Sequence, residues 1–180
     1  KDVKVGKKVV VIGGGNTAMD AARTAVRLGA ESVSILYRRR EVDMPAEKRE
    51  VMEAKEEGVK IIPLSAPLAF EGDGTVSRIR CNKMALGERD ADGRRSVVKA
   101  DGQEFFVDAD TVIVAVSQYS DFPFINKDEV EMTEWGKLVI DEHMMTTMDG
   151  VFSGGDVTRG SATAIEAIAD GKKAAESIAK

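Results

Sequence analysis

The chain has 180 residues, with 26 Lys and Arg against 31 Asp and Glu, a formal net charge of −5, and a single Cys and a single His. The single Cys and His exclude a disulfide scaffold, a CxxC redox pair and a Cys/His zinc site, and the negative charge argues against a general nucleic-acid binder. No apolar run approaches the roughly 18 residues of a membrane-helix candidate, and the N-terminal residues do not resemble a signal peptide, so a cytoplasmic location is expected.

Alternating strand and helix patterns occupy the first third of the chain. A β-branched run at Val9–Ile12 predicts a buried parallel strand, and small apolar residues at helical spacing predict a helix over Thr17–Leu28. Val33–Tyr37 predicts a second strand, Pro45–Glu57 a helix with proline in its first turn, and Val59–Ile62 a third strand. This βαβαβ order is typical of the mononucleotide-binding half of a doubly wound sheet.

The pattern changes in the rest of the chain. Residues 65–110 carry short alternating segments separated by Gly and Asp turns, which predict an antiparallel meander of about three strands. Thr111–Val116 predicts another buried strand, Lys137–Ile140 and Val151–Phe152 predict short strands, and Thr163–Ala179 predicts a closing helix. The predicted fold class is α/β: a Rossmann-like NAD(P)-binding domain with a central parallel sheet and a three-stranded antiparallel crossover meander.

A glycine-rich loop joins the first predicted strand to the first predicted helix. Its sequence is Gly13-Gly14-Gly15-Asn16-Thr17-Ala18, a G-x-G-x-x-A fingerprint. Gly13 permits a tight turn, Gly15 lets a pyrophosphate approach the backbone, and Ala18 lets the helix pack close to the strand. The helix N-terminus offers free N–H groups to the phosphates. A glycine turn without a ligand is the alternative, and the strand–loop–helix context favours dinucleotide binding.

The end of the second predicted strand distinguishes NADP(H) from NAD(H). An NAD site places Asp or Glu there to accept a hydrogen bond from the ribose 2′-hydroxyl, whereas this chain has Arg38, Arg39 and Arg40. Guanidinium groups suit a 2′-phosphate because they donate forked, charge-assisted hydrogen bonds. A solvated basic turn is the alternative. We assign Arg38 and Arg39 to the cofactor and expect NADPH rather than NADH.

Several runs of the chain resemble a known family. They are GGGNTAMDAARTAVRLGA at 13–30, YRR at 37–39, MPA at 44–46, EGV at 57–59 and GVFSGGDVTRGSATAIEAIADGKKAA at 150–175. Together they resemble the glutamate synthase small (β) subunit family of two-dinucleotide-binding-domain flavoproteins. The resemblance covers nearly the whole chain.

The resemblance implies a domain organisation. In such flavoproteins the NAD(P)H domain is inserted into an FAD domain that opens with its own glycine loop. This chain contains one such loop, so we expect a C-terminal fragment: an NAD(P)H-binding domain at 5–116 and the last segment of an FAD-binding domain at 117–180. The rest of the FAD domain would lie upstream, and iron–sulfur clusters would lie in a missing N-terminal region or in a partner subunit.

The resemblance also implies flavin contacts in the tail. Asp156 is similar to the family aspartate that hydrogen-bonds a ribityl hydroxyl of FAD, and Gly155 would let the backbone come close. The helix beginning near Thr163 and Ala164, where Thr163 and Glu166 fit a capping box, would present N–H groups to the flavin pyrimidine edge. A simple turn before a helix is the alternative for the Gly-Gly-Asp sequence.

The expected activity of the parent protein is hydride transfer from NADPH to FAD, with electrons passing on to iron–sulfur centres or a partner subunit. No catalytic side chain is assigned, because the cofactors carry this chemistry. A non-redox NADP-binding sensor or regulatory module is the alternative. One departure from the family is Ala115-Val116-Ser117 where Ala-x-Gly is usual, which predicts a slightly different crossover geometry.

Three further expectations concern packing. Cys81 is expected to be a buried structural thiol, and the acidic helix Glu47–Glu57 a solvated face. The closing helix should carry one apolar face, which an upstream FAD half would cover in the parent, so the fragment should form a homodimer or have a poorly ordered tail. That face comprises Ala164, Ile168, Gly171, Ala175 and Ile178.

Overall fold

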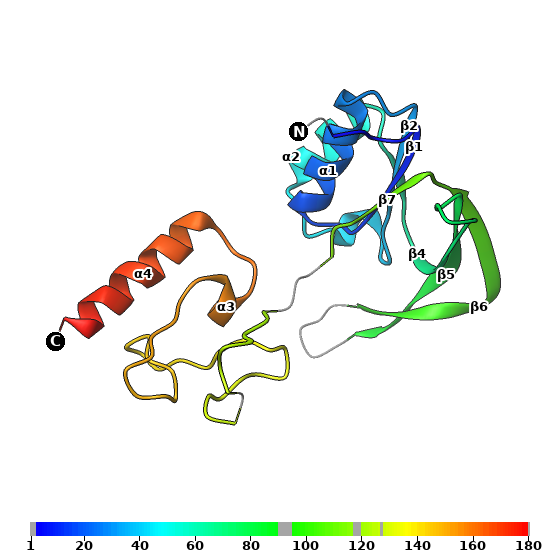
Figure 1. The fold of residues 1–180 in the computed structure, drawn as a ribbon. Coiled ribbons are helices and arrows are strands. Elements are labelled where there is room, and N and C mark those ends of the chain that lie inside the picture. The colour runs from blue at the N-terminus through cyan, green and yellow to red at the C-terminus, as the bar shows by residue number, and fades with distance from the viewer. Residues whose placement is uncertain (1–2, 90–94, 117–119, 127, 180) are drawn as a thin grey trace. The chain divides into compact units, whose positions relative to one another are not determined.

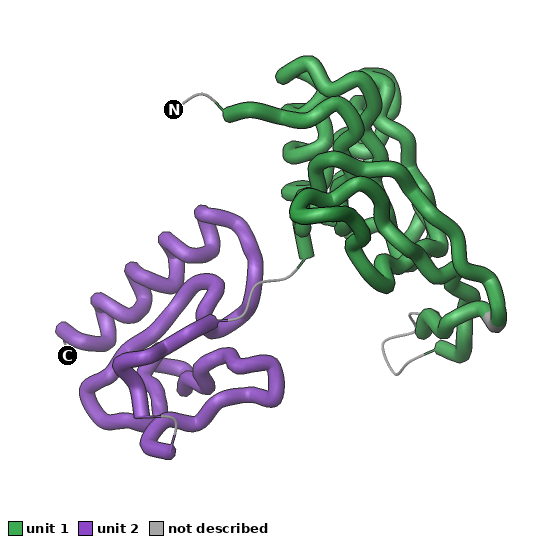
Figure 2. The backbone as a smooth tube through the Cα atoms, turned by 45° about the vertical axis from the view of Figure 1, so that its right-hand side comes forward, with its two compact units in different colours: residues 1–116 green, residues 117–180 purple. Residues whose placement is uncertain are grey.

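The computed structural model describes residues 3–89, 95–116, 120–126 and 128–179. The chain divides into two compact units, residues 1–116 and 117–180 (Figure 2), and each is described by itself. Within the described ranges, no helix is both long enough and apolar enough to cross a membrane. Ser117, which carries the departure from the family pattern, lies outside the described residues.

A four-stranded parallel sheet forms the centre of the first unit (Figure 1). Its strands, in the order β3-β2-β1-β7, are all parallel neighbours. The alternating side chains of β1 serve two cores: Val9 and Val11 pack against the helices, while Val10 and Ile12 pack against a second sheet. A strand buried on both faces explains the unbroken apolar run that predicted it. The bounds are β1 Lys8–Ile12, β2 Ser32–Leu36, β3 Lys60–Ile62 and β7 Thr111–Val114.

Helices α1 (Asn16–Arg27) and α2 (Lys48–Glu56) contribute to the same core on one face of the sheet. The small buried residues of α1 allow it to lie close to β1, as its alanine pattern predicts, and Met19 is fully buried beside them. The predicted start of the second helix at Pro45 is wrong, because α2 begins at Lys48. The N–H of Ala46 donates to Gly14 O at 3.1 Å, and Glu47 remains extended at ψ 132°. These residues therefore lie against the glycine loop before the helix begins.

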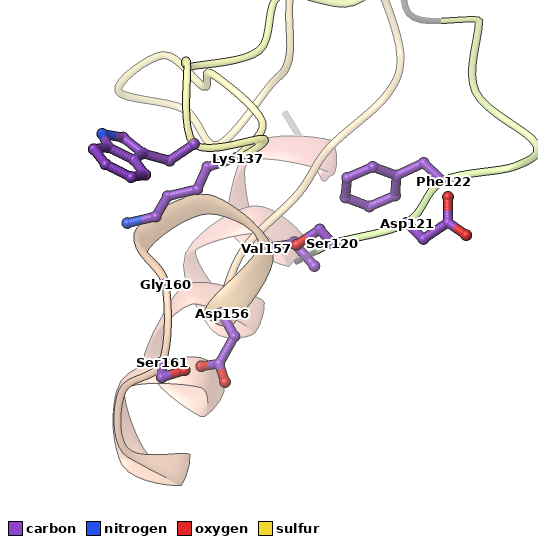
Figure 3. A pocket seen from close by; sticks show the side chains of 9 residues that line it. Ser120, Asp121, Phe122, Lys137, Asp156, Val157, Gly160 and Ser161 are labelled. Atoms are coloured by element: carbon purple, nitrogen blue, oxygen red, sulfur yellow. The ribbon is translucent and has the colours of Figure 1, made fainter. Parts of the chain in front are cut away.

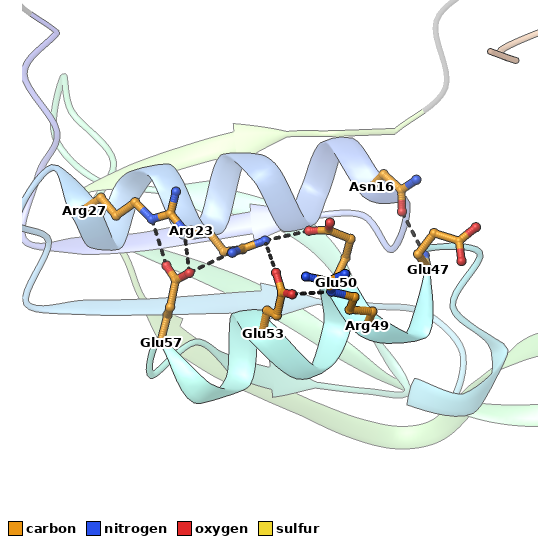
Figure 4. A network of polar contacts seen from close by, with 8 residues as sticks. All are labelled: Asn16, Arg23, Arg27, Glu47, Arg49, Glu50, Glu53 and Glu57. Atoms are coloured by element: carbon orange, nitrogen blue, oxygen red, sulfur yellow. Dashed lines mark hydrogen bonds and ion pairs between the residues drawn. The ribbon is translucent and has the colours of Figure 1, made fainter. Parts of the chain in front are cut away.

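An ion-pair cluster joins the two helices, contrary to the expectation that the acidic helix is only a solvated face (Figure 4). The side chain of Arg23 is 16% exposed and lies 2.6–3.0 Å from the carboxylates of Glu50, Glu53 and Glu57. Arg27 also binds Glu57, at 2.6 Å. One face of α2 is therefore bound to α1 by ion pairs. The positions of Arg23 and Arg27 in the sequence do not by themselves predict this contact.

We expect Arg23→Met to lower the Tm by about 3–6 °C at pH 7, because it leaves three carboxylates without their shared cation. The Arg27 guanidinium, with a further contribution from Arg23, lowers the pKa of Glu57, and Arg49 and Arg23 lower that of Glu53. A depressed folded-state pKa stabilises the fold above the ordinary pKa near 4.5, and this stability is lost as the pH falls through the folded-state pKa. The deficit of the variant should therefore shrink below pH 4.5, as thermal unfolding across pH would show; a pH-independent deficit would contradict the ion-pair origin.

The predicted meander is confirmed as a three-stranded antiparallel sheet in the order β4-β5-β6. Its strands are β4 (Ser65–Glu71), β5 (Arg78–Arg89) and β6 (Arg95–Asp108). Ile79 and Cys81 of β5 are fully buried and pack with β1 and β2 residues on the second face of the parallel sheet. The parallel sheet is therefore covered by helices on one face and by this antiparallel sheet on the other.

Cys81 is confirmed as a buried thiol, and burial raises its pKa to about 11. At pH 8 only about one thiol in a thousand would be ionised, and the thiolate is the reactive form. Labelling of the folded chain with Ellman's reagent should therefore be at least ~100-fold slower than labelling in guanidinium chloride. Rapid, stoichiometric labelling of the folded chain would show that Cys81 is accessible.

The second unit has little regular sheet and ends in a helix. A short helix, α3 (Asp156–Arg159), precedes α4 (Ala164–Ile178), which confirms the predicted closing helix. The strands predicted at Lys137–Ile140 and Val151–Phe152 are wrong: among the described residues of this unit, these segments form only isolated bridges. The bridges are Met132–Leu138, Ile140–Thr146 and Met145–Phe152.

Candidate functional site

The glycine loop follows β1. Gly13 and Gly14 are buried, whereas Gly15 is partly exposed. Gly13 has φ +147°, and a Cβ on it would lie 2.2 Å from the carbonyl oxygen of Ala115. A Cβ on Gly14 would lie 2.4 Å from the Tyr37 ring, so this glycine accommodates a neighbouring aromatic side chain. Gly15 differs, because a Cβ there would meet no described residue within 4 Å. The first two glycines serve the fold, and Gly15 leaves open space at the loop.

The N-terminus of α1 borders this open space. Gly15 is the N-cap residue, and the first turn contains no acidic residue. Asn16 and Thr17 are exposed, whereas Ala18 is fully buried against the sheet. The first N–H groups of a helix have no partner within the helix and carry the positive end of its dipole. The loop can therefore accept an anion such as a diphosphate.

The glycine loop is tied to the segment that follows β2. Gly13 N–H donates to Leu36 O at 3.1 Å. Figure 4 shows the second contact, in which Glu47 N–H donates to the Asn16 side-chain oxygen at 2.8 Å. The Asn16 side chain therefore positions the loop before α2, a role that sequence reasoning missed. These contacts hold the arginine-bearing segment beside the glycine loop.

The three consecutive arginines have different environments. Arg40 is occupied by Asp43, to which its Nε and one terminal nitrogen donate at 2.8 Å. Arg38 is exposed and forms no ion pair with any residue that the structure describes. Arg39 is half-buried, and its buried Nε–H has no hydrogen-bond partner within the described part of the chain. The two arginines assigned to the cofactor are thus the two left available for an anionic ligand.

In the second unit, the Gly-Gly-Asp sequence forms a tight turn into α3. Gly155 has φ +73°, and a Cβ on it would approach the Ala167 side chain to 3.3 Å. A Cβ on Gly154 would lie 2.7 Å from that of Asp170. Both glycines therefore permit close packing against α4, while Asp156 is exposed and accepts a weak 3.3 Å hydrogen bond from Ala162 N–H.

A buried carboxylate supports this turn, and sequence reasoning missed it. Asp170 is 5% exposed and accepts hydrogen bonds from Gly155 N–H at 2.8 Å and from Arg159 Nε at 3.0 Å. A second nitrogen of Arg159 also donates to it. The Gly155 N–H, followed by the Arg159 guanidinium, lowers the pKa of Asp170. The sequence offered no clear signal for this role, because α4 carries other charged residues and its packed side is not the apolar stripe that the sequence predicts.

Asp156 also borders a hollow of about 310 Å³ in the second unit (Figure 3). Lys137 lies at its edge and donates to the carbonyl of Arg159 at 2.7 Å. The site is polar, with acidic, basic and hydroxyl groups beside aromatic rings. Its lining residues are Ser120, Asp121, Phe122, Trp135, Lys137, Asp156, Val157, Gly160 and Ser161.

The start of α4 has the predicted capping box. The Thr163 hydroxyl donates to the Glu166 carboxylate at 2.7 Å, and Glu166 N–H donates back to the hydroxyl at 3.3 Å. The Thr163 backbone N–H also donates to the Glu166 carboxylate, at 2.9 Å, and the Thr163 carbonyl accepts from Ala167 N–H at 3.2 Å. Thr163 is thus engaged by its own helix, and of the two predicted contact residues the exposed Ala164 is the one whose backbone is able to face a ligand. The predicted apolar face of α4 is exposed, including Ile168 at 60% and Ile178 at 62%. Self-association through it stays a prediction.

The sequence profile of the pyridine nucleotide-disulphide oxidoreductase family matches residues 1–171. The chain belongs to this family. Its relatives include the glutamate synthase [NADPH] small chain of Azospirillum brasilense, 48% identical over 96% of this chain and 36% of that protein. The NADP(+)-dependent formate dehydrogenase subunit beta of Moorella thermoacetica is 42% identical over 96% of this chain and 25% of that protein.

The fold has a close counterpart among solved structures. Thioredoxin reductase from T. acidophilum matches 96% of this chain and 51% of that chain, with a TM-score of 0.78 and 28% identity. The predicted α/β class and the predicted family are therefore confirmed. The chain spans about a third or less of the length of the curated relatives described above. The cofactor roles of individual residues stay predictions.

Proposed function

We propose that the chain supplies the NADPH site and part of the FAD site of an NADPH-dependent flavoprotein oxidoreductase. The observation that carries the proposal is the open, acid-free N-terminus of α1 at Gly15, held beside Arg38 and Arg39, which form no ion pair with the residues that the structure describes. When bound, the two cofactors supply hydride transfer from nicotinamide to flavin. The chain itself binds, orients and shields them.

The residues of the first unit fit NADPH. Gly15 and the exposed N–H groups at Asn16 and Thr17 would hold the diphosphate. Arg38 and Arg39 would hold the 2′-phosphate, and the unpaired, buried Nε–H of Arg39 fits an anionic acceptor. Gly13, Gly14 and Ala18 would act by shaping the loop. An NADH site would need a carboxylate at this strand end instead.

The residues of the second unit fit a polyol such as the ribityl chain of FAD. Asp156 is exposed and presents a hydrogen-bond acceptor at the hollow, while Gly155 would act by letting the turn pack against α4. At the start of α4 the exposed Ala164 backbone would face the flavin, while Thr163 would act by capping the helix, because its N–H is bound to Glu166. Complete FAD binding would require chain outside these 180 residues, and iron–sulfur centres or a partner subunit would receive the electrons. Relatives named as a small chain and a subunit beta support assembly with partners.

Isothermal titration calorimetry of this chain with NADPH, NADH and FAD tests the binding part of the proposal. NADPH should bind at least ~10-fold more tightly than NADH, a difference of about 1.4 kcal/mol, and FAD should not bind tightly. Equal or tighter NADH binding would contradict the 2′-phosphate assignment. Tight FAD binding would contradict the assignment of residues 117–180 as part of a divided flavin site.

The redox part needs the complete protein of which this chain is a part. Under anaerobic conditions, NADPH should bleach its flavin absorbance. A protein that binds NADPH but lacks a reducible flavin would support a non-redox sensor module instead.

A further inference from the structure

Asp170 has no role in the proposed cofactor contacts, yet it is the most deeply buried acidic side chain that the structure describes. Burial of a carboxylate is costly unless hydrogen bonds and an opposite charge compensate it. Here the hydrogen-bond donors that the structure describes all belong to one short segment, Gly155 to Arg159. The carboxylate therefore joins α4 to the turn that carries Asp156.

The hydrogen bonds of Asp170 fix both ends of α3. Gly155, immediately before the helix, donates its backbone N–H, and Arg159, at the last helical position, donates two nitrogens of its guanidinium. Such a fork to a carboxylate restricts orientation as well as distance. Asp156 lies between these two anchors, so its backbone position follows from Asp170.

The surrounding packing restricts the side chains of Asp170 and Arg159. Gly154 lies so close to Asp170 that a Cβ would approach it to 2.7 Å. Arg159 also lies 3.5 Å from Glu166 of the capping box, and its carbonyl accepts from Lys137 at the edge of the hollow. One network thus connects the exposed Asp156, the hollow and the start of α4.

We propose that Asp170, acting through Gly155 and Arg159, is a positioning residue that sets the Asp156 carboxylate for a polyol hydroxyl of the flavin cofactor. This inference rests on the proposed function. The hydroxyl contact belongs to Asp156, and Asp170 does not touch the cofactor. Asp170→Asn preserves the size of the side chain but removes the charge that the Arg159 fork requires. The variant should therefore release α3 without creating a cavity.

The test uses the complete flavoprotein with Asp170→Asn, and with Asp149→Asn as a matched control at an exposed acid of the same unit. The FAD dissociation constant should rise at least tenfold in Asp170→Asn, and the visible circular dichroism of the bound flavin should change. The KM for NADPH should stay within twofold of wild type. In hydrogen exchange, the amides of residues 155–160 should lose protection, while those of α1 should not. Asp149→Asn should match wild type in each measurement.

A second variant covers the case in which Asp170→Asn fails to fold. Arg159→Lys keeps the positive charge but loses the fork, and should raise the FAD dissociation constant about threefold. Unchanged FAD affinity and unchanged flavin dichroism in a folded variant would overturn the positioning role. A wild-type protein that binds no FAD would overturn the proposed function together with this inference, whereas FAD binding that ignores both variants would overturn this inference alone.

Discussion

Replacing Gly13 with alanine is expected to lower the free energy of unfolding by about 3 kcal/mol or more. Two causes act together. The residue has φ +147°, a conformation that L side chains rarely adopt, and the new Cβ would lie 2.2 Å from a backbone oxygen of Ala115. That oxygen belongs to the segment after β7, whose Ala115 N–H is already bound to Ile12 O at 2.8 Å. Neither strand can move without breaking the sheet, so the clash cannot be relieved locally.

Gly15→Ala is the matched control, and it should have the opposite profile. In the part of the chain that the structure describes, nothing lies within 4 Å of its added Cβ, and φ is −89°. We expect stability within about 0.5 kcal/mol of wild type, because the poorer N-cap is offset by reduced freedom of the unfolded chain. NADPH affinity should fall at least ~10-fold, since the methyl group would occupy the approach of the diphosphate.

Chemical denaturation and calorimetric titration distinguish the two glycines. A Gly13→Ala variant as stable as wild type would contradict the strain at the loop. A Gly15→Ala variant that binds NADPH normally would show that the diphosphate does not approach this residue. The pair therefore separates the part of the motif that builds the fold from the part that faces a ligand.

Local patterns predicted the elements whose cause is local. The apolar run of β1, the alanine spacing of α1 and the Thr163–Glu166 cap each depend on residues within a few positions, and each appears where expected. The meander after residue 64 also followed from turn residues. The helix start at Pro45 failed because contacts to Gly14 and Asn16, about thirty residues earlier in the sequence, decide where α2 begins.

The features that sequence reasoning missed are all pairings between distant positions. Asp170 binds Gly155 across a turn and a loop, and Arg23 meets carboxylates on a different helix. The Tyr37 ring explains why Gly14 must be glycine, although the fingerprint leaves that position open. The position of a charged residue in the sequence does not show which residue it will pair with. Before the fold is known, the same acids and arginines are equally consistent with solvated surfaces.

The second large effect concerns the arginines after β2. Arg38→Ser combined with Arg39→Met should weaken NADPH binding by about 10- to 100-fold, because hydrogen bonds between charged groups contribute roughly 1.5–3 kcal/mol. Methionine at position 39 keeps the apolar stem of this half-buried side chain, so the fold should be retained. NADH lacks the 2′-phosphate, and its affinity should change less than threefold.

The selectivity, rather than the affinity alone, identifies the phosphate contact. Arg95→Ser removes an arginine from the first residue of β6, in the antiparallel sheet, and should leave the affinities for both nucleotides unchanged.

In wild type, the preference for NADPH should diminish as salt rises, because exposed charges such as Arg38 are screened. The half-buried Arg39 should be screened less, so part of the preference should persist at high salt. If the double variant lost NADPH and NADH affinity equally, the arginines would shape the loop instead of binding the 2′-phosphate, and the chain would have no structural basis for choosing NADPH.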